Sequence, residues 1–280
     1  MREMSFRNLF AVPGSILLSL LLGGGAGRNV HGQTPQECGS VSGVVKIAAR
    51  ALSPPLFPVT KDEKYCGKEK SSHRLLVGRG GGVQSAVVYL ESVRQEKMPD
   101  ISSRTVLEQK GCEYVPHILL VPVGGELTIV NGDPILHNVH AYQSAEPEQT
   151  KFNIAQPVKG QRTIVGRENF THAGIFMVTC DAGHPWMNAY VFVTPHRCYA
   201  LTDKDGRFTL RDVPPGKYRL SMWHEGVAVA GAEMDGGKVR SYRYESPYEY
   251  QQAIVVHEGK ETKSDFSFAL RNQGIVSRAR

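Results

Sequence analysis

The sequence has 280 residues, of which 41% are hydrophobic and 21% charged, and a formal net charge of +6. This composition fits one large or two modest globular domains and excludes disordered, collagen-like and multi-span membrane proteins. Charges of both signs are mixed along the chain without a basic stripe interleaved with aromatic residues, so nucleic-acid binding is not indicated. The 29 glycines and 16 prolines favour many short strands joined by turns.

Residues 1–32 predict an export signal peptide. Arg2 and Arg7 provide a positive start, residues 9–22 form an apolar run, and small residues follow. The run is shorter than the ~20 residues of a membrane-spanning helix, so we expect cleavage and no membrane span in the mature chain; an uncleaved anchor is the alternative. The mature protein is therefore predicted to be periplasmic or extracellular.

Residues 38–105 contain two β-rich runs, 41–48 and 83–93, with a glycine-rich stretch at 78–82 between them. These glycines are not followed by the Lys-Ser/Thr pair of a phosphate loop, so they predict a flexible hairpin connection. We expect this segment to be an N-terminal β extension of the next domain, giving one domain over residues 38–195.

Residues 105–195 form the core of that domain and carry the most regular pattern. Turn signals recur about every ten residues, which is typical of an all-β sandwich or barrel. The predicted strands are residues 118–123, 126–130, 137–142, 152–154, 162–165, 174–180 and 189–194.

Residues 196–280 predict a second, smaller β unit. Its turns contain Asp-Lys-Asp-Gly and Pro-Pro-Gly, which are strong turn formers. Its predicted strands are residues 207–210, 217–223, 250–257 and 263–270.

The five cysteines are Cys38, Cys66, Cys112, Cys180 and Cys198. An odd count in an exported protein leaves at least one cysteine outside intramolecular disulfides, unless a metal holds it. Export permits disulfides, and Cys38–Cys66 is the bridge that we consider first. The sequence alone leaves the connectivity open.

Four residues form a candidate metal site. His137 stands at the start of one predicted strand, and Cys180, His184 and Met187 lie together in a later loop. A thiolate and two imidazoles with a weak axial thioether are the ligands of a copper electron-transfer site. Sulfur suits Cu(I) and nitrogen suits Cu(II), so this set predicts one mononuclear copper ion.

The stretch YVPHILLVPVGGELTIVNGDPILHNVH at residues 114–140, followed by CDAGHPWM at 180–187, resembles the amicyanin, pseudoazurin and plastocyanin-like cupredoxins. The resemblance covers about a third of the chain and implies a Greek-key β-sandwich with copper ligands at His137, Cys180, His184 and Met187. Amicyanin-like loops have two residues between Cys and His, whereas this loop has three. That departure bears most on the axial position of Met187.

Several alternatives remain open at this site. His140 can replace His137 as a ligand. Cys112 lies near the copper end in this family, and a Cys112–Cys180 disulfide would consume the thiolate and abolish the site. Alternatively, Cys112 or Glu113 supplies an extra ligand and gives a non-blue or zinc-like site.

Other residues near the ligands have expected supporting roles. Asn138 is expected to brace the two ligand loops by a hydrogen bond, and Trp186 to shield the metal from water. Met187 can instead be a core residue, and His117 a packed histidine at a strand start.

The stretch YALTDKDGRFTLRDVPPGKYRL at residues 199–220 is similar to the carboxypeptidase regulatory-like domain, a transthyretin-like sandwich. The usual first strand of that domain is not evident here. The resemblance implies a structural or adhesive module, and polysaccharide binding follows by fold analogy alone.

Taken together, the sequence predicts an all-β exported protein that binds one copper ion and either transfers single electrons to a redox partner protein or holds copper. The alternative is a metal-free structural or carbohydrate-binding β-sandwich. The sequence contains no nucleophile motif, paired-carboxylate signature or zinc-protease pattern, so it does not predict an enzyme.

Overall fold

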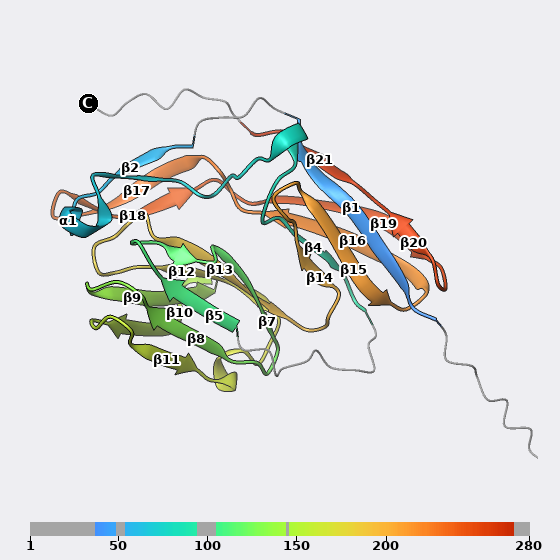
Figure 1. Cartoon of the computed structure of the whole chain (residues 1–280), viewed down its shortest axis with the longest axis horizontal. Helices are drawn as coiled ribbons and strands as arrows, with labels where there is room; N and C mark the ends of the chain where they lie inside the picture. The colour runs from blue at the N-terminus through green and yellow to red at the C-terminus, as the bar shows by residue number, and fades with distance from the viewer. Residues whose placement is uncertain (1–36, 49–53, 94–104, 144–145, 272–280) are drawn as a thin grey trace, which may run out of the picture. The chain divides into compact units, whose positions relative to one another are not determined.

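The computed structural model describes residues 37–48, 54–93, 105–143 and 146–271 (Figure 1). Strands dominate these residues, and the predicted all-β sandwich class is confirmed. The short helical elements among them are α1 (Glu63–Cys66) and two 3-10 turns, η1 (Arg79–Gly81) and η2 (Arg167–Asn169). None of the described helices has the length and apolarity to cross a membrane. The predicted export signal lies outside the described residues.

Two sheets form a first sandwich around one core. The five-stranded sheet has the order β10 (Glu146–Gln156), β9 (His137–Gln143), β12 (Gly174–Thr179), β13 (Asn188–Thr194) and β7 (Ile118–Pro122). The four-stranded sheet has the order β11 (Arg162–Val165), β8 (Leu127–Asn131), β5 (Thr105–Gln109) and β6 (Tyr114–Val115).

The core of the first sandwich follows from the alternation of side chains along its strands. Leu127 and Ile129 of β8 and Val139 and Ala141 of β9 point inward and are fully buried. Strand β13 is buried on both faces, because Phe192 on its other face packs in a separate apolar cluster with Trp223 and Tyr190. A strand buried on both faces reads as a continuous apolar run, as the sequence of β13 does.

Two further sheets enclose a second core. One has the order β14 (Tyr199–Leu201), β4 (Val87–Leu90), β16 (Gly216–His224) and β19 (Tyr248–Val256). In the other, β15 (Arg207–Val213) and β20 (Glu261–Lys263) pair with β1 (Gly39–Ile47), which also pairs with β21 (Phe266–Phe268). Inward residues such as Val41, Leu90, Phe208 and Leu220 fill this core.

The strands β1 and β4 differ from our expectation. We expected residues 38–105 to extend the 105–195 domain, but β1 pairs with β15 and β4 pairs with β14 and β16 of the C-terminal segment. The strand that the C-terminal unit lacked in the sequence is therefore supplied by the N-terminal part of the chain. Gly82 permits this connection, because a Cβ there would lie 2.0 Å from the Asp205 carbonyl oxygen. The domain boundaries themselves remain a prediction.

Two short antiparallel pairs complete the described fold. One is formed by β17 (Val229–Asp235) and β18 (Lys238–Tyr244), the other by β2 (Leu56–Pro58) and β3 (Glu69–Ser71). Helix α1 lies between β2 and β3, and a disulfide joins its Cys66 to Cys112. The Cys38–Cys66 bridge that we considered first is therefore incorrect, and Cys38 is an exposed free thiol.

Candidate metal centre

The candidate centre lies where the ends of neighbouring strands meet. His137 is the first residue of β9, Cys180 directly follows β12, and His184 and Met187 lie in the turn that leads into β13. Strand β12 pairs with both β9 and β13, which brings the two segments together. The four side chains are buried, with exposed fractions of 0% for both histidines, 3% for Cys180 and 2% for Met187.

The structure brings three predicted ligands to one point. Donor atoms of His137, Cys180 and His184 all lie within 4.8 Å of one another. The Nδ1 atoms of the two histidines are 3.2 Å apart, and His184 Nδ1 is 3.6 Å from Cys180 Sγ. Nitrogen and sulfur bound at about 2.0 and 2.3 Å around one ion lie roughly 3.3 to 3.7 Å apart at tetrahedral to trigonal angles, so the donor spacing fits a single metal ion.

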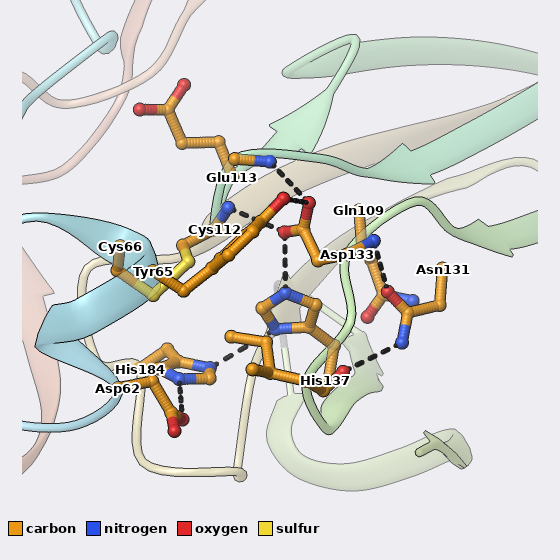
Figure 2. Close-up of polar contacts among 12 residues, drawn as sticks. Asp62, Tyr65, Cys66, Gln109, Cys112, Glu113, Asn131, Asp133, His137 and His184 are labelled. Carbon is orange, nitrogen blue, oxygen red and sulfur yellow. Dashed lines mark hydrogen bonds and ion pairs between the residues drawn. A yellow bond between two sulfur atoms is a disulfide. The ribbon is translucent and has the colours of Figure 1, made fainter. Parts of the chain in front are cut away.

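Both imidazoles are oriented by carboxylates on their opposite nitrogens. His137 Nε2 lies 2.9 Å from Asp133 Oδ2, and His184 Nε2 lies 2.9 Å from Asp62 Oδ2 (Figure 2). A carboxylate accepts hydrogen bonds, so the proton of each neutral ring is on Nε2 and the lone pair on Nδ1. The two Nδ1 lone pairs therefore face each other. Such an arrangement is repulsive by itself and is suited to a cation between them.

Burial keeps both rings in the neutral form that a metal requires. Burial lowers the pKa of His137, although Asp133 acts in the opposite direction. Burial likewise lowers the pKa of His184, and this effect outweighs the hydrogen bond to Asp62. Metal binding requires unprotonated imidazoles, so both rings are in the form that can bind a metal.

Asp133 fixes the position of the His137 ring by a hydrogen bond. Its carboxylate accepts hydrogen bonds from the backbone N–H groups of Gly111 and Cys112 and from the Tyr65 hydroxyl, as well as from His137 (Figure 2). Burial would raise the pKa of Asp133, but these donors together lower it. The carboxylate therefore stays ionised and fixes the imidazole.

The loop after β12 presents the thiol of Cys180. Burial raises the pKa of Cys180, and backbone N–H groups of Ala182 and Asn138 oppose this effect. A bound cation would lower this raised pKa, because a coordinated thiol is deprotonated. Gly183 has φ +89°, a conformation in which a side chain is strained, and it turns the chain so that His184 faces back toward Cys180.

Asn138, Trp186 and Met187, which are expected to support the site, lie beside its three donors. Asn138 Oδ1 accepts a hydrogen bond of 3.2 Å from the backbone N–H of Asp181, which connects the two ligand segments. Trp186 packs 5.3 Å from the His184 ring and donates its indole N–H to the carbonyl oxygen of Cys112. Met187 is buried in the same core cluster as Cys180. Its role as an axial ligand remains a prediction.

The alternative ligands are engaged elsewhere. His140 Nδ1 lies 2.6 Å from Asp181 Oδ2, and its Nε2 lies 2.8 Å from the Thr150 hydroxyl. Glu113 faces His73 and Lys70.

Cys112 is bonded to Cys66 and Cys180 is a free thiol. The alternative Cys112–Cys180 disulfide is therefore contradicted. Cys112 is also unavailable as an extra ligand, although it lies close to Asp133 and His137.

Sequence reasoning missed both carboxylates of the site. Asp133 stands four residues before His137 in an Asn-Gly-Asp-Pro turn, and that short spacing was a usable signal. Asp62 is 122 residues from His184 in the chain, and no local pattern connects them. Tyr114 was also missed; its hydroxyl donates to the carbonyl oxygens of Asn138 and Thr179 at the base of the site.

Comparison with sequence families gives one partial match. Residues 198–264 match the model of polysaccharide lyase family 4, domain II. No curated protein sequence matches the chain.

Comparison with solved structures gives partial matches to copper proteins. A copper-containing nitrite reductase (NirK) from Thermus scotoductus SA-01 aligns with 33% of this chain and 22% of its own, at 21% identity and a TM-score of 0.28. A purple cupredoxin from Nitrosopumilus maritimus aligns with 32% of this chain and 99% of its own, at 23% identity and a TM-score of 0.27. An amicyanin mutant in the Cu(I) form aligns with 38% of this chain and 98% of its own, at 24% identity and a TM-score of 0.27.

Proposed function

We propose that this chain is an exported protein that holds one copper ion between His137, Cys180 and His184, with Met187 as a weaker axial ligand. The observation that carries the proposal is the convergence of three buried donors. Two Nδ1 lone pairs are 3.2 Å apart, the thiol of Cys180 lies beside them, and both opposite nitrogens are bound to carboxylates.

Copper is favoured over hard cations by the type of donors. A thiolate with two imidazoles and a nearby thioether is the set that copper electron-transfer sites use, whereas hard cations such as Ca²⁺ and Mg²⁺ prefer oxygen. Bound copper supplies one-electron chemistry by moving between Cu(I) and Cu(II). The residues of this chain fix the imidazoles, exclude water and keep the thiol available. We propose transfer of single electrons with a partner protein, or storage of copper, in the periplasm or outside the cell.

Copper titration tests this proposal. The purified protein with Cu(II) should bind one equivalent and develop intense visible absorption from sulfur-to-copper charge transfer. Cys180→Ser should abolish this absorption, whereas Cys38→Ser removes an exposed thiol outside the site and should preserve it. A colourless wild-type complex, or equal absorption in Cys180→Ser, would contradict the proposal.

A second candidate function concerns the C-terminal segment, and the match to a polysaccharide lyase domain favours it. One face of the β14–β4–β16–β19 sheet packs through Val87 and Trp223 in the apolar cluster with Phe192. Beside that cluster it carries a row of paired residues, which are the half-buried Tyr199 and Tyr89, the buried Ser221 and the exposed Gln251. Glu91 beside this row accepts hydrogen bonds from Ser221 and Gln251. We propose that this face binds polysaccharide through stacked tyrosines and polar groups.

Binding of the full chain to a panel of plant and bacterial polysaccharides tests the second candidate. Tyr89→Ala should weaken binding, since Tyr89 and Tyr199 stack with ring centroids 4.8 Å apart. Tyr250→Ala is the matched control because Tyr250 lies one residue from Gln251 and so on the opposite face of β19. Absence of binding, or equal loss in both variants, would reject this candidate.

A further inference from the structure

The segment 61–70, which includes α1, closes the metal centre from outside the ligand loops. It contacts both the His137 side and the His184 side of the centre. Its contacts are Lys61 Nζ to the Ala182 carbonyl oxygen at 2.7 Å, Asp62 to His184 at 2.9 Å, the Tyr65 hydroxyl to Asp133 at 2.7 Å, Lys70 Nζ to the Gly111 carbonyl oxygen at 2.5 Å, and the Cys66–Cys112 disulfide.

Asp62 has a conformation and a contact that its place in the helix does not explain. It occupies the N-cap position of α1, where an aspartate usually accepts a hydrogen bond from the first helical turn. Asp62 makes no such side-chain cap, and its backbone is left-handed with φ 55°. A left-handed conformation outside glycine persists where surrounding contacts enforce it. The carboxylate is directed to His184 instead of to the helix that it begins.

The exposed fractions show that Asp62 lies between His184 and the solvent. The side chain of His184 is 0% exposed, whereas that of Asp62 is 30% exposed. Without Asp62, the Nε2–H of His184 would be a buried donor without this acceptor, at a cost comparable to a lost hydrogen bond. The ring would then gain by turning or by moving its proton, and either change would take the Nδ1 lone pair away from the cluster.

We propose that Asp62 is a positioning residue of the copper site, which fixes the proton of His184 on Nε2 and thereby aims Nδ1 at the metal. The inference rests on the proposed copper site and adds a residue from a distant segment to it. Carboxylate partners of ligating histidines are typically worth 10–100-fold in metal affinity.

The Cys66–Cys112 disulfide extends this inference to the whole segment. Cys112 is next to Gly111 in the loop that binds Asp133, so the bridge ties the segment of Asp62 to the loop that orients His137. Removal of the bridge frees α1 from that loop and lowers the fraction of molecules in which Asp62 reaches His184. The disulfide therefore supports copper retention through Asp62.

Cu(I) affinity provides the first test, measured on the full chain by competition with the chelator bathocuproine disulfonate. We expect Asp62→Ala to bind Cu(I) roughly 10–100-fold more weakly and Asp62→Asn to fall between it and the wild type. Glu63→Gln removes a charge from the next, exposed residue of α1 and should leave the affinity unchanged.

A double-mutant cycle tests whether the disulfide acts through Asp62. The variant Cys66→Ser/Cys112→Ser should lose affinity, and adding Asp62→Ala to it should cause little further loss. Independent, multiplicative losses would overturn the linkage. Denaturation curves of each variant separate loss of the site from loss of the fold.

The histidine tautomer provides a readout that needs no copper. Long-range ¹H–¹⁵N spectra of the copper-free protein should show His184 protonated on Nε2 in the wild type and in Glu63→Gln, but not uniquely so in Asp62→Ala. An unchanged tautomer and unchanged Cu(I) affinity in Asp62→Ala would overturn the role of Asp62 and leave the copper site standing. A wild-type protein that binds no copper would overturn both.

Discussion

Two buried polar clusters in this molecule differ in how their charges are matched. Arg74 and Glu225 are 2% and 1% exposed, and Arg74 Nη2 lies 2.8 Å from Glu225 Oε2. The guanidinium also donates to the Gly226 carbonyl oxygen and to the hydroxyl of Tyr190, while His117 contacts the second oxygen of Glu225. We call this set of residues the Arg–Glu cluster. Its donors meet acceptors, and its positive charge meets a negative one.

The metal centre has the opposite character. His137, His184 and Cys180 direct electron-pair donors at one another, and their hydrogen-bond donors point outward to Asp133 and Asp62. The Arg–Glu cluster pairs a buried positive group with a buried negative one, so its expected role is to hold the fold. In the candidate metal centre the electron-pair donors face one another, so its expected role is to bind a cation. Electron-pair donors that face one another in a buried cluster are therefore more informative about function than burial or polarity alone.

The largest expected effect is on the stability of the Arg–Glu cluster. Arg74→Met leaves Glu225 buried without its partner and should lower the free energy of unfolding by about 3–5 kcal/mol. Arg219→Met is the matched control, because Arg219 is 62% exposed and its pair with Glu91 is worth at most about 1 kcal/mol. Urea denaturation measures both. A loss below about 1 kcal/mol in Arg74→Met would show that the cluster is dispensable.

Copper should stabilise the fold through the other cluster. A ligand that binds only the folded state at 1,000 times its dissociation constant adds about 4 kcal/mol to the free energy of unfolding. We expect a gain on this scale for the wild type and a much smaller one for Cys180→Ser. Thermal and urea denaturation with and without copper measure it. Equal gains in the two proteins would place the copper elsewhere.

The pH dependence of stability distinguishes the Arg–Glu cluster further. Burial would raise the pKa of Glu225, but Arg74 and His117 outweigh burial and lower it below its ordinary value of 4.5. The unfolded chain therefore binds a proton at a higher pH than the folded chain. The difference in the free energy of unfolding between the wild type and Glu225→Gln should be constant above the pKa that Glu225 has in the unfolded chain. It should shrink as the pH falls below that pKa. A difference that grows toward low pH would reverse the assigned direction.

The smallest expected effect concerns the axial position. Met187→Leu conserves volume and should cost less than about 1.5 kcal/mol of stability. It should retain copper and colour while changing the reduction potential and the electron paramagnetic resonance spectrum, because the axial ligand tunes such sites. Met222→Leu alters a buried methionine of the second core and should change neither property. Identical spectra for Met187→Leu and the wild type would remove Met187 from the ligand set.

The sequence predicted the features that depend on local patterns. Strand β11 coincides with the predicted residues 162–165, and β9 and β7 lie within a residue of their predicted ends. These strands show the alternation or apolar runs that burial requires. The sequence grouped His137, Cys180 and His184 by their donor types, and the structure brings their donor atoms together, while their role as ligands stays a prediction.

The features that the sequence did not predict depend on contacts between distant segments or on an absent pattern. The pairing of β1 with β15 and the Cys66–Cys112 bridge both join remote residues. The hairpin of β17 and β18 is half-buried to exposed along its length, so it lacks the apolar alternation that marks a strand. Asp62 was missed for the first reason, since nothing near it in the chain indicates a metal.

X-ray absorption spectroscopy of the copper-loaded protein tests the central claim most directly. The copper neighbours should include one short sulfur and two imidazole nitrogens, and the sulfur signal should disappear in Cys180→Ser. Copper surrounded only by nitrogen and oxygen in the wild-type protein would contradict that claim.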